Sequence, residues 1–170
     1  MADLKEKTRN AIELFNQHRI DEWMKDFTDD AELVSPLAGR VKGRDAIKAR
    51  MAQTIETYPD IKVTPQRIFN DSNVIVLEYT VTGTNTGPLQ LQTGDVLPAT
   101  NKKVELAAVD IATSDANGRI TSIHQYFDVA SALQQLGLMP APAAARVNVV
   151  GPHPALPRRR GRVEQGAEVR

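Results

Sequence analysis

The chain has 170 residues, equal numbers of basic and acidic side chains (21 each), no cysteine and 41% hydrophobic residues. This length predicts one domain with a hydrophobic core, and the lack of cysteine excludes disulfides, thiol nucleophiles and Cys-ligated metals. No apolar run approaches the roughly 18 residues of a membrane span, and the charged N-terminus lacks a signal-peptide core, so we predict a cytoplasmic protein.

The net charge of zero hides a difference between two regions of the chain. Residues 1–140 carry 15 Lys and Arg against 19 Asp and Glu, whereas residues 141–170 carry six Arg against two Glu. The acidic first region gives no electrostatic reason to expect nucleic-acid binding. The second region is rich in Ala, Pro and Arg and has no periodicity, so we predict a folded domain over 1–140 and a mostly disordered tail over 141–170.

Helical spacing of apolar residues dominates the first 60 residues. The pattern predicts helices over about 4–17, 21–27 and 46–57, with a short strand over 31–35 between the second and the third. A turn at 36–39 follows the strand, and Pro59 ends the third helix.

From residue 61 the period of the apolar residues changes to two. Strands are predicted over 61–69 and 74–84, with a weaker one over 89–95, a long hairpin over 104–128 and a last helix over 129–136. Pro65 places the first of these strands at a sheet edge or in a bulge. The order of the elements predicts an α+β fold, in which three N-terminal helices and a curved antiparallel sheet form a cone with an internal pocket.

The long hairpin carries polar residues where a one-sided sheet would be apolar. Alternation along its second strand predicts that one side carries Ile120, Ser122, His124, Tyr126 and Asp128. Asp110 lies on the partner strand, within cross-strand reach of His124, and an imidazole with a carboxylate can transfer protons. The structural alternatives are a histidine hydrogen-bonded at a strand end and an aspartate in an ion pair at the sheet rim. Asp128 is expected to cap the last helix.

Four segments resemble the SnoaL-like polyketide cyclases and ester cyclases of the nuclear transport factor 2-like superfamily, which includes ketosteroid isomerase. The resemblance covers about Lys7 to Pro140. The segments read FTDDAEL at 27–33, GRDAI at 43–47, GTNTGP at 83–88, and GRI through YFD to LQQLG between 118 and 137. The resemblance implies the cone fold and its internal pocket.

The resemblance also implies a cofactor-independent enzyme that acts on a hydrophobic carbonyl compound. Proton abstraction next to the carbonyl would precede an aldol-type closure or an isomerisation, with His124 and Asp110 sharing the acid/base work. Asp110 falls where the isomerase holds its oxyanion with an aspartic acid, and Ser35 falls at the position of its catalytic base. Because serine cannot replace a carboxylate base, steroid isomerisation is not expected. Asn85 stands where the family often has histidine.

The remaining expectations concern ligands and partners. The predicted substrate contacts are Tyr126, Phe15, Trp23, Asn85 and Ser35. No metal, cofactor, nucleic acid or membrane partner is expected. A homodimer is expected to cover an apolar outer sheet face, whose candidate residues are Val104, Leu106, Ile111, Ile123 and Phe127.

Two other functions stay open. The first is a non-catalytic small-molecule binding domain of the same fold. The second is hydrolysis of the kind performed by the superfamily's epoxide hydrolases, which carry an arginine two residues before one aspartate. It ranks last because Ala108 takes that position before Asp110.

Overall fold

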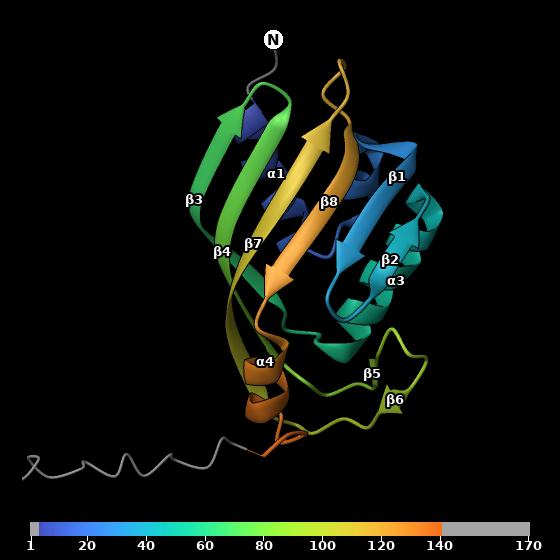
Figure 1. Cartoon of the computed structure of the whole chain (residues 1–170), viewed down its shortest axis with the longest axis vertical. Coiled ribbons are helices and arrows are strands. Elements are labelled where there is room, and N and C mark those ends of the chain that lie inside the picture. Colours follow the sequence, from blue (N-terminus) through green and yellow to red (C-terminus); the bar gives the residue numbers. More distant parts are fainter. Residues whose placement is uncertain (1–3, 141–170) are drawn as a thin grey trace, which may run out of the picture.

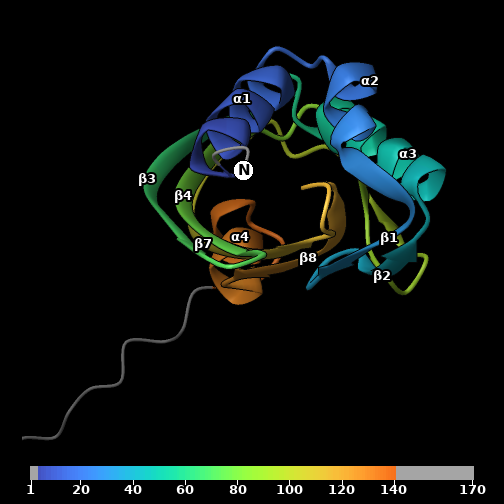
Figure 2. The ribbon, with the colours of Figure 1, turned by 90° about the horizontal axis from the view of Figure 1, so that it is seen from above.

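The computed structural model describes residues 4–140, and the predicted tail 141–170 lies outside the described residues. The predicted α+β fold is confirmed: helices cover the concave face of a curved six-stranded sheet (Figures 1 and 2). The strand order in this sheet is β2-β1-β8-β7-β4-β3, and β5 and β6 form a separate pair. None of the described helices has the length and the apolar composition needed to cross a membrane.

The four predicted helices are present, and the second is shorter than predicted: it ends at Trp23, a 3-10 turn follows it, and Phe27 already belongs to a strand. Their bounds are α1 (Leu4–Asn16), α2 (Ile20–Trp23), the 3-10 turn η1 (Met24–Asp26), α3 (Arg44–Thr57) and α4 (Val129–Gln135). The predicted cap of the last helix is confirmed, because the Asp128 carboxylate accepts a hydrogen bond from the Ser131 amide at 3.0 Å. At the other end of α4, Gly137 has a φ of 70° and the amides of Gly137 and Leu138 bond back into the helix, which forms a Schellman motif.

The long strands extend the predicted ones, whereas the weaker strand predicted over 89–95 is reduced to Leu89–Gln90 and pairs with an unpredicted short strand at Val96–Leu97. Their bounds are β1 (Phe27–Ser35), β2 (Gly39–Lys42), β3 (Lys62–Asp71), β4 (Val74–Thr84), β5 (Leu89–Gln90), β6 (Val96–Leu97), β7 (Lys103–Ser114) and β8 (Ile120–Phe127). Two further features were not predicted. β2 forms where only a turn was expected, and β1 lies parallel to β8, although an antiparallel sheet was expected.

Two irregularities in the sheet control which side chains face the helices. On β3, an extra residue next to Pro65 shifts the pairing with β4, and β3 is an edge strand, as Pro65 predicted. On β8, Ser114 of β7 pairs with Ile120, and Thr113 pairs with Ser122. Thr121 is therefore the extra residue of a β-bulge, which reverses the alternation of faces along the rest of the strand.

The largest buried cluster lies where α2 and α3 meet β1. Phe27 and Ile47 are almost completely buried there, and partly buried aromatic rings pack around them. The Trp23 ring is 4.9 Å from the Phe27 ring and 5.6 Å from the Phe15 ring, and both pairs meet edge to face. These contacts hold α1 and α2 together above the sheet and leave space between the helices and the central strands.

Candidate active site

A mainly apolar cavity of about 270 Å³ lies between the helices and the concave face of the sheet. Figure 2 shows α1, α2 and α3 on one side and the curved sheet on the other, and the residues that line the cavity come from both layers. Much of its sheet wall consists of Ile75, Leu77, Val81, Leu106, Ala108 and Ala112. The volume is just below the range of about 300–1,000 Å³ that is typical of small-molecule sites, so the cavity has room for one small ligand.

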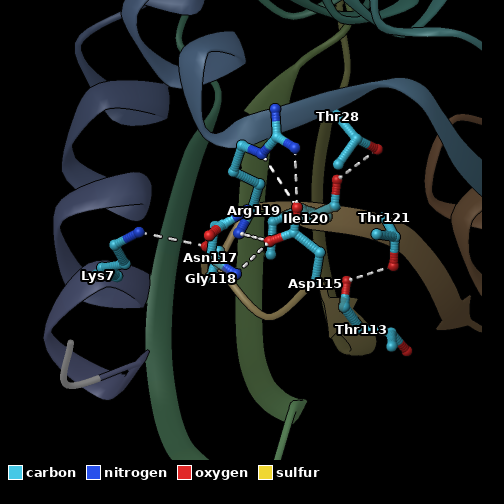
Figure 3. Close-up of polar contacts among 9 residues, drawn as sticks. All are labelled: Lys7, Thr28, Thr113, Asp115, Asn117, Gly118, Arg119, Ile120 and Thr121. Atoms are coloured by element: carbon cyan, nitrogen blue, oxygen red, sulfur yellow. Dashed lines mark hydrogen bonds and ion pairs between the residues drawn. The ribbon is translucent and has the colours of Figure 1, made fainter. Parts of the chain in front are cut away.

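Two different segments close the ends of this cavity. At one end, α4 contributes Ala132 and is fixed to β7 because the Gln135 side chain bonds both the amide and the carbonyl of Glu105. At the other end, the β7–β8 turn approaches α1, where the Lys7 ammonium donates to the Gly118 carbonyl at 3.2 Å (Figure 3). Asp115 shapes this turn by accepting hydrogen bonds from backbone amides and from the Arg119 side chain.

Asp110 lies in the cavity wall at the centre of the sheet, where two neighbouring strands supply its hydrogen-bond partners. The Tyr79 hydroxyl on β4 donates to Asp110 Oδ1 at 3.0 Å, and the Gln125 amide on β8 donates to Asp110 Oδ2 at 3.4 Å. All three residues line the cavity. Each carboxylate oxygen therefore has one protein donor and keeps lone-pair capacity for a ligand.

Burial controls the protonation of this group. It raises the pKa of Asp110 from 3.8 to about 6, although the hydrogen bonds from Tyr79 and Gln125 act in the opposite direction. Burial, followed by the neighbouring Asp110 charge, raises the pKa of Tyr79 above its ordinary value, so Tyr79 remains a donor at neutral pH. A carboxyl group with a pKa of about 6 can accept a proton near neutral pH and return it afterwards, which is what acid/base chemistry requires.

His124 does not share this cavity, and the predicted placement of His124 beside Asp110 is wrong. The bulge at Thr121 turns Ile123, Gln125 and Phe127 toward the cavity, so His124 faces the outer side of the sheet. Its cross-strand neighbour is Ile111, and the residue opposite Asp110 is Gln125. The structure therefore replaces the expected carboxylate–imidazole pair with a carboxylate held by a phenol and an amide.

The other predicted site residues divide into two groups. Phe15, Trp23 and Ser35 lie in the cavity wall, and their contact with a substrate stays a prediction. Tyr126 belongs to the outer face with His124 and is 53% exposed, so its predicted place in the pocket is wrong. Asn85 does not line the cavity: it is fully buried, and its carboxamide bonds the Gly87 carbonyl and the amide and hydroxyl groups of Thr100.

Most residues that were predicted for the outer, dimer-forming surface lie on the cavity face instead. Of the five apolar candidates for the dimer surface, only Ile111 faces outward. The other four line the cavity: Val104, Leu106, Ile123 and Phe127. Among residues 4–140, no three His, Asp or Glu side chains gather in a group that could hold a metal ion.

Residues 8–123 match the family model of the SnoaL-like domain, which covers more than half of the chain. The chain belongs to this family. The resemblance seen in the sequence is thereby confirmed, while a comparison with curated proteins gave no match.

Solved structures share the SnoaL-like fold at low sequence identity. AclR from Streptomyces galilaeus, assigned as a hydroxylase, has a TM-score of 0.68 and 19% identity over 85% of this chain and 87% of its own. A protein from Jannaschia sp. CCS1, assigned as a SnoaL-like polyketide cyclase, has a TM-score of 0.66 and 18% identity over 82% and 98%. SalBIII, an epoxide hydrolase/cyclase-like enzyme of pyran ring formation in salinomycin, has a TM-score of 0.63 and 19% identity over 77% and 97%.

The sequence reasoning assigned neither Tyr79 nor Gln125 to this SnoaL-like site. It left open whether Tyr79 or Glu78 faces the cavity, and the apolar series Ile75, Leu77 and Val81, which shares a face of β4 with Tyr79, could have decided the question. Gln125 could not have been found by alternation, since strict counting from Ile120 places it on the outer face. Only the bulge turns Gln125 inward.

Proposed function

We propose that this SnoaL-like protein is a cofactor-independent acid/base enzyme that acts on a hydrophobic carbonyl compound. Asp110 removes a proton from the carbon next to the carbonyl, and the resulting enolate closes a ring by an aldol-type step or is reprotonated at another position. The observation that carries the proposal is the placement of Asp110, whose carboxyl group is held by Tyr79 and Gln125 in a mainly apolar wall.

The physical setting supports this assignment of roles. The Asp110 carboxylate needs no metal to accept a proton, because burial has already raised its pKa to about 6. The protonated carboxyl group and the Tyr79 hydroxyl can then donate hydrogen bonds to the enolate oxygen. An apolar wall strengthens such bonds because it excludes water. The names of the structural neighbours, a polyketide cyclase and an epoxide hydrolase/cyclase-like enzyme, agree with ring-forming chemistry.

Proton abstraction can be tested without knowing the natural substrate. In deuterated buffer, the enzyme should replace the hydrogens next to the carbonyl of tetralone, a bicyclic aryl ketone, with deuterium, which NMR detects as a loss of signal. We expect Asp110→Asn to lower the rate by at least about 100-fold, since positioned acid/base groups contribute on that order.

Two variants on the outer face serve as matched controls for this exchange. Glu78→Gln makes the same carboxyl-to-amide change on the side of β4 that faces away from the cavity, and His124→Gln removes the imidazole from the outer face of β8. Both should exchange tetralone at the wild-type rate. Exchange that survives Asp110→Asn but is lost in His124→Gln would overturn the proposal.

The second candidate is a small-molecule binding domain without catalysis, which the apolar cavity also favours. It would be supported if tetralone binds saturably while no exchange depends on Asp110. Epoxide hydrolysis ranks third. The Asp110 carboxyl is held by Tyr79 and Gln125, and position 108, where the epoxide hydrolases carry an arginine, is an alanine.

We also propose a cytoplasmic homodimer that pairs through the outer face of the sheet. Three large apolar side chains on that face are exposed: Phe69 and Tyr126 at 53% each, and Ile111 at 37%. Exposed apolar surface of this kind is commonly covered by a partner, and a self-complementary face favours a second copy of the same chain.

A further inference from the structure

The cavity wall has a second polar region, formed by Arg50 of α3 and by Tyr58 directly after it. The Arg50 side chain is half-buried, and its Nη1 donates one long hydrogen bond of 3.4 Å to the Gln90 carbonyl. Within residues 4–140, no carboxylate forms an ion pair with Arg50. Its charge therefore lacks a counter-ion in the described part of the protein.

Arg50 and Tyr58 lie close enough to affect each other electrostatically. Burial lowers the pKa of Arg50, while burial raises the pKa of Tyr58 and the nearby Arg50 charge opposes that rise. Arginine nevertheless stays charged at neutral pH, because its ordinary pKa is above 12. Arg50 and Tyr58 both line the cavity that contains Asp110.

This region lies toward one end of the cavity, away from Asp110. The Tyr58 ring packs against Gly83, where an added Cβ would lie 3.1 Å from Tyr58 Cβ, and Gly83 pairs with Val104 of β7. Val104 precedes Asp110 by six positions on that strand, which corresponds to roughly 20 Å at about 3.3 Å per residue. Apolar side chains line the wall between them, including Val81, Leu106 and Ala108.

We propose that the cavity binds a hydrophobic molecule that carries a carboxylate. Arg50 forms an ion pair with this carboxylate, and Tyr58 donates a further hydrogen bond to it. The inference rests on the proposed function, because it names the substrate class for the same cavity. The apolar body of this molecule extends along β7 and brings its carbonyl group to Asp110. A guanidinium donates two parallel bonds to a carboxylate, and the single negative charge of the carboxylate matches the charge of Arg50. A phosphate would bring a second charge, whereas the other basic side chain that lines the cavity among residues 4–140, Lys7, lies at the opposite end beside Gly118.

The test compares a fluorinated naphthoate with its neutral methyl ester, which differ in the charge of one group. Binding of each to the full-length protein is followed by ¹⁹F NMR, a readout that does not need turnover. We expect the acid to bind wild type about tenfold more tightly than the ester, since hydrogen bonds to charged groups contribute on that order. Arg50→Met should remove this preference by weakening the acid alone, and Arg50→Lys should keep part of it.

The matched control is Arg67→Met, which removes a guanidinium on β3 outside the cavity, where Arg67 pairs with Glu78. It should keep the wild-type preference for the acid.

The inference is overturned if wild type binds acid and ester equally, or if the preference survives Arg50→Met. If neither probe binds wild type, the proposed ligand cavity fails together with the inference. If the acid preference depends on Arg50 while Asp110→Asn leaves tetralone exchange intact, the inference holds and the proposed chemistry fails.

Discussion

Asp110 is a residue at which function and stability oppose each other. Its pKa is about 6 in the folded protein and 3.8 in an unfolded chain, so between these values the folded state binds more protons. The stability that this carboxyl contributes is therefore full below pH 3.8 and is lost as the pH rises through 6. At neutral pH the ionised group makes the folded state less stable than a neutral group in the same place would.

We therefore expect Asp110→Asn to make the protein more stable above pH 7, while it removes the proposed activity. The free energy of unfolding at pH 8 should rise by about 1–3 kcal/mol, because asparagine avoids the cost of a buried charge. Urea unfolding at pH 8 and pH 4.5 measures this change, and the gain should shrink at the lower pH. A variant equally or less stable than wild type at pH 8 would contradict the assigned burial of the charge.

Tyr79 should set the pH at which Asp110 ionises. The hydrogen bond from its hydroxyl lowers the pKa of Asp110, so Tyr79→Phe should move that pKa above its wild-type value of about 6. The other titratable residues in the cavity wall are Lys7, Asp26, Arg50 and Tyr58.

A ¹³C NMR titration of labelled aspartate carboxyl groups measures the shift, with the Asp110 signal assigned by its loss in Asp110→Asn. Tyr126→Phe is the matched control, because it removes a phenol from the outer face and should leave the Asp110 midpoint unchanged. An unchanged midpoint in Tyr79→Phe would show that the hydroxyl does not stabilise the carboxylate.

Among the elements, the segment between β4 and β5 shows how tightly the fold fixes the end of α3. Gly87 passes so close to the end of this helix that an added Cβ would lie 2.2 Å from the Glu56 carbonyl oxygen. The Gly87 amide bonds the Thr57 carbonyl, and the Thr57 hydroxyl bonds the Pro88 carbonyl at 2.7 Å. A side chain at Gly87 therefore requires the backbone to move.

We expect Gly87→Ala to lower the free energy of unfolding by about 2 kcal/mol or more, because no flexible side chain can yield. Gly94→Ala is an informative comparison. Gly94 has a φ of 88° but open space around it, so that variant should lose only about 1 kcal/mol from backbone strain. Thermal unfolding measures the loss of stability in both variants. A larger loss in Gly87→Ala than in Gly94→Ala would show the cost of the steric contact at Gly87, and equal losses would contradict the close approach there.

At the same scale, β8 shows where sequence reasoning reaches its limit. The strand itself, its turn and the helix cap at Asp128 follow from local patterns and were predicted correctly. The identity of the cavity face was not, since one extra residue at Thr121 reverses the side on which every later residue lies. Bulges depend on pairing with neighbouring strands, and β8 has two such neighbours, so local sequence does not reveal them.

For the molecule as a whole, the cone could be predicted and the details of its site only in part. Element order and the family resemblance lead to helices over a curved sheet, and Asp110 stands in the cavity as expected. The partners of Asp110 come from strands 31 and 15 residues away in sequence, so no local pattern joins Tyr79, Gln125 and Asp110. Such contacts depend on the register of the complete sheet.

The register also defines the outer face on which the whole protein is expected to pair. One row of residues crosses five strands in the order Phe69, Val76, Ile111, His124 and Val34. Four of these five residues are apolar. A second copy related by a two-fold axis would bury this row against itself, which removes the exposed apolar surface of both chains.

We therefore expect wild type to have twice the 18.7 kDa mass of one chain in light scattering after size-exclusion chromatography. Ile111→Glu places a charge at the centre of the row and should shift the population to monomers, because the interface would have to desolvate that charge. Asn10→Glu adds the same charge on the exposed side of α1 and should leave the mass unchanged. A monomeric wild type, or a dimer insensitive to Ile111→Glu, would show that this face of the sheet is not the interface.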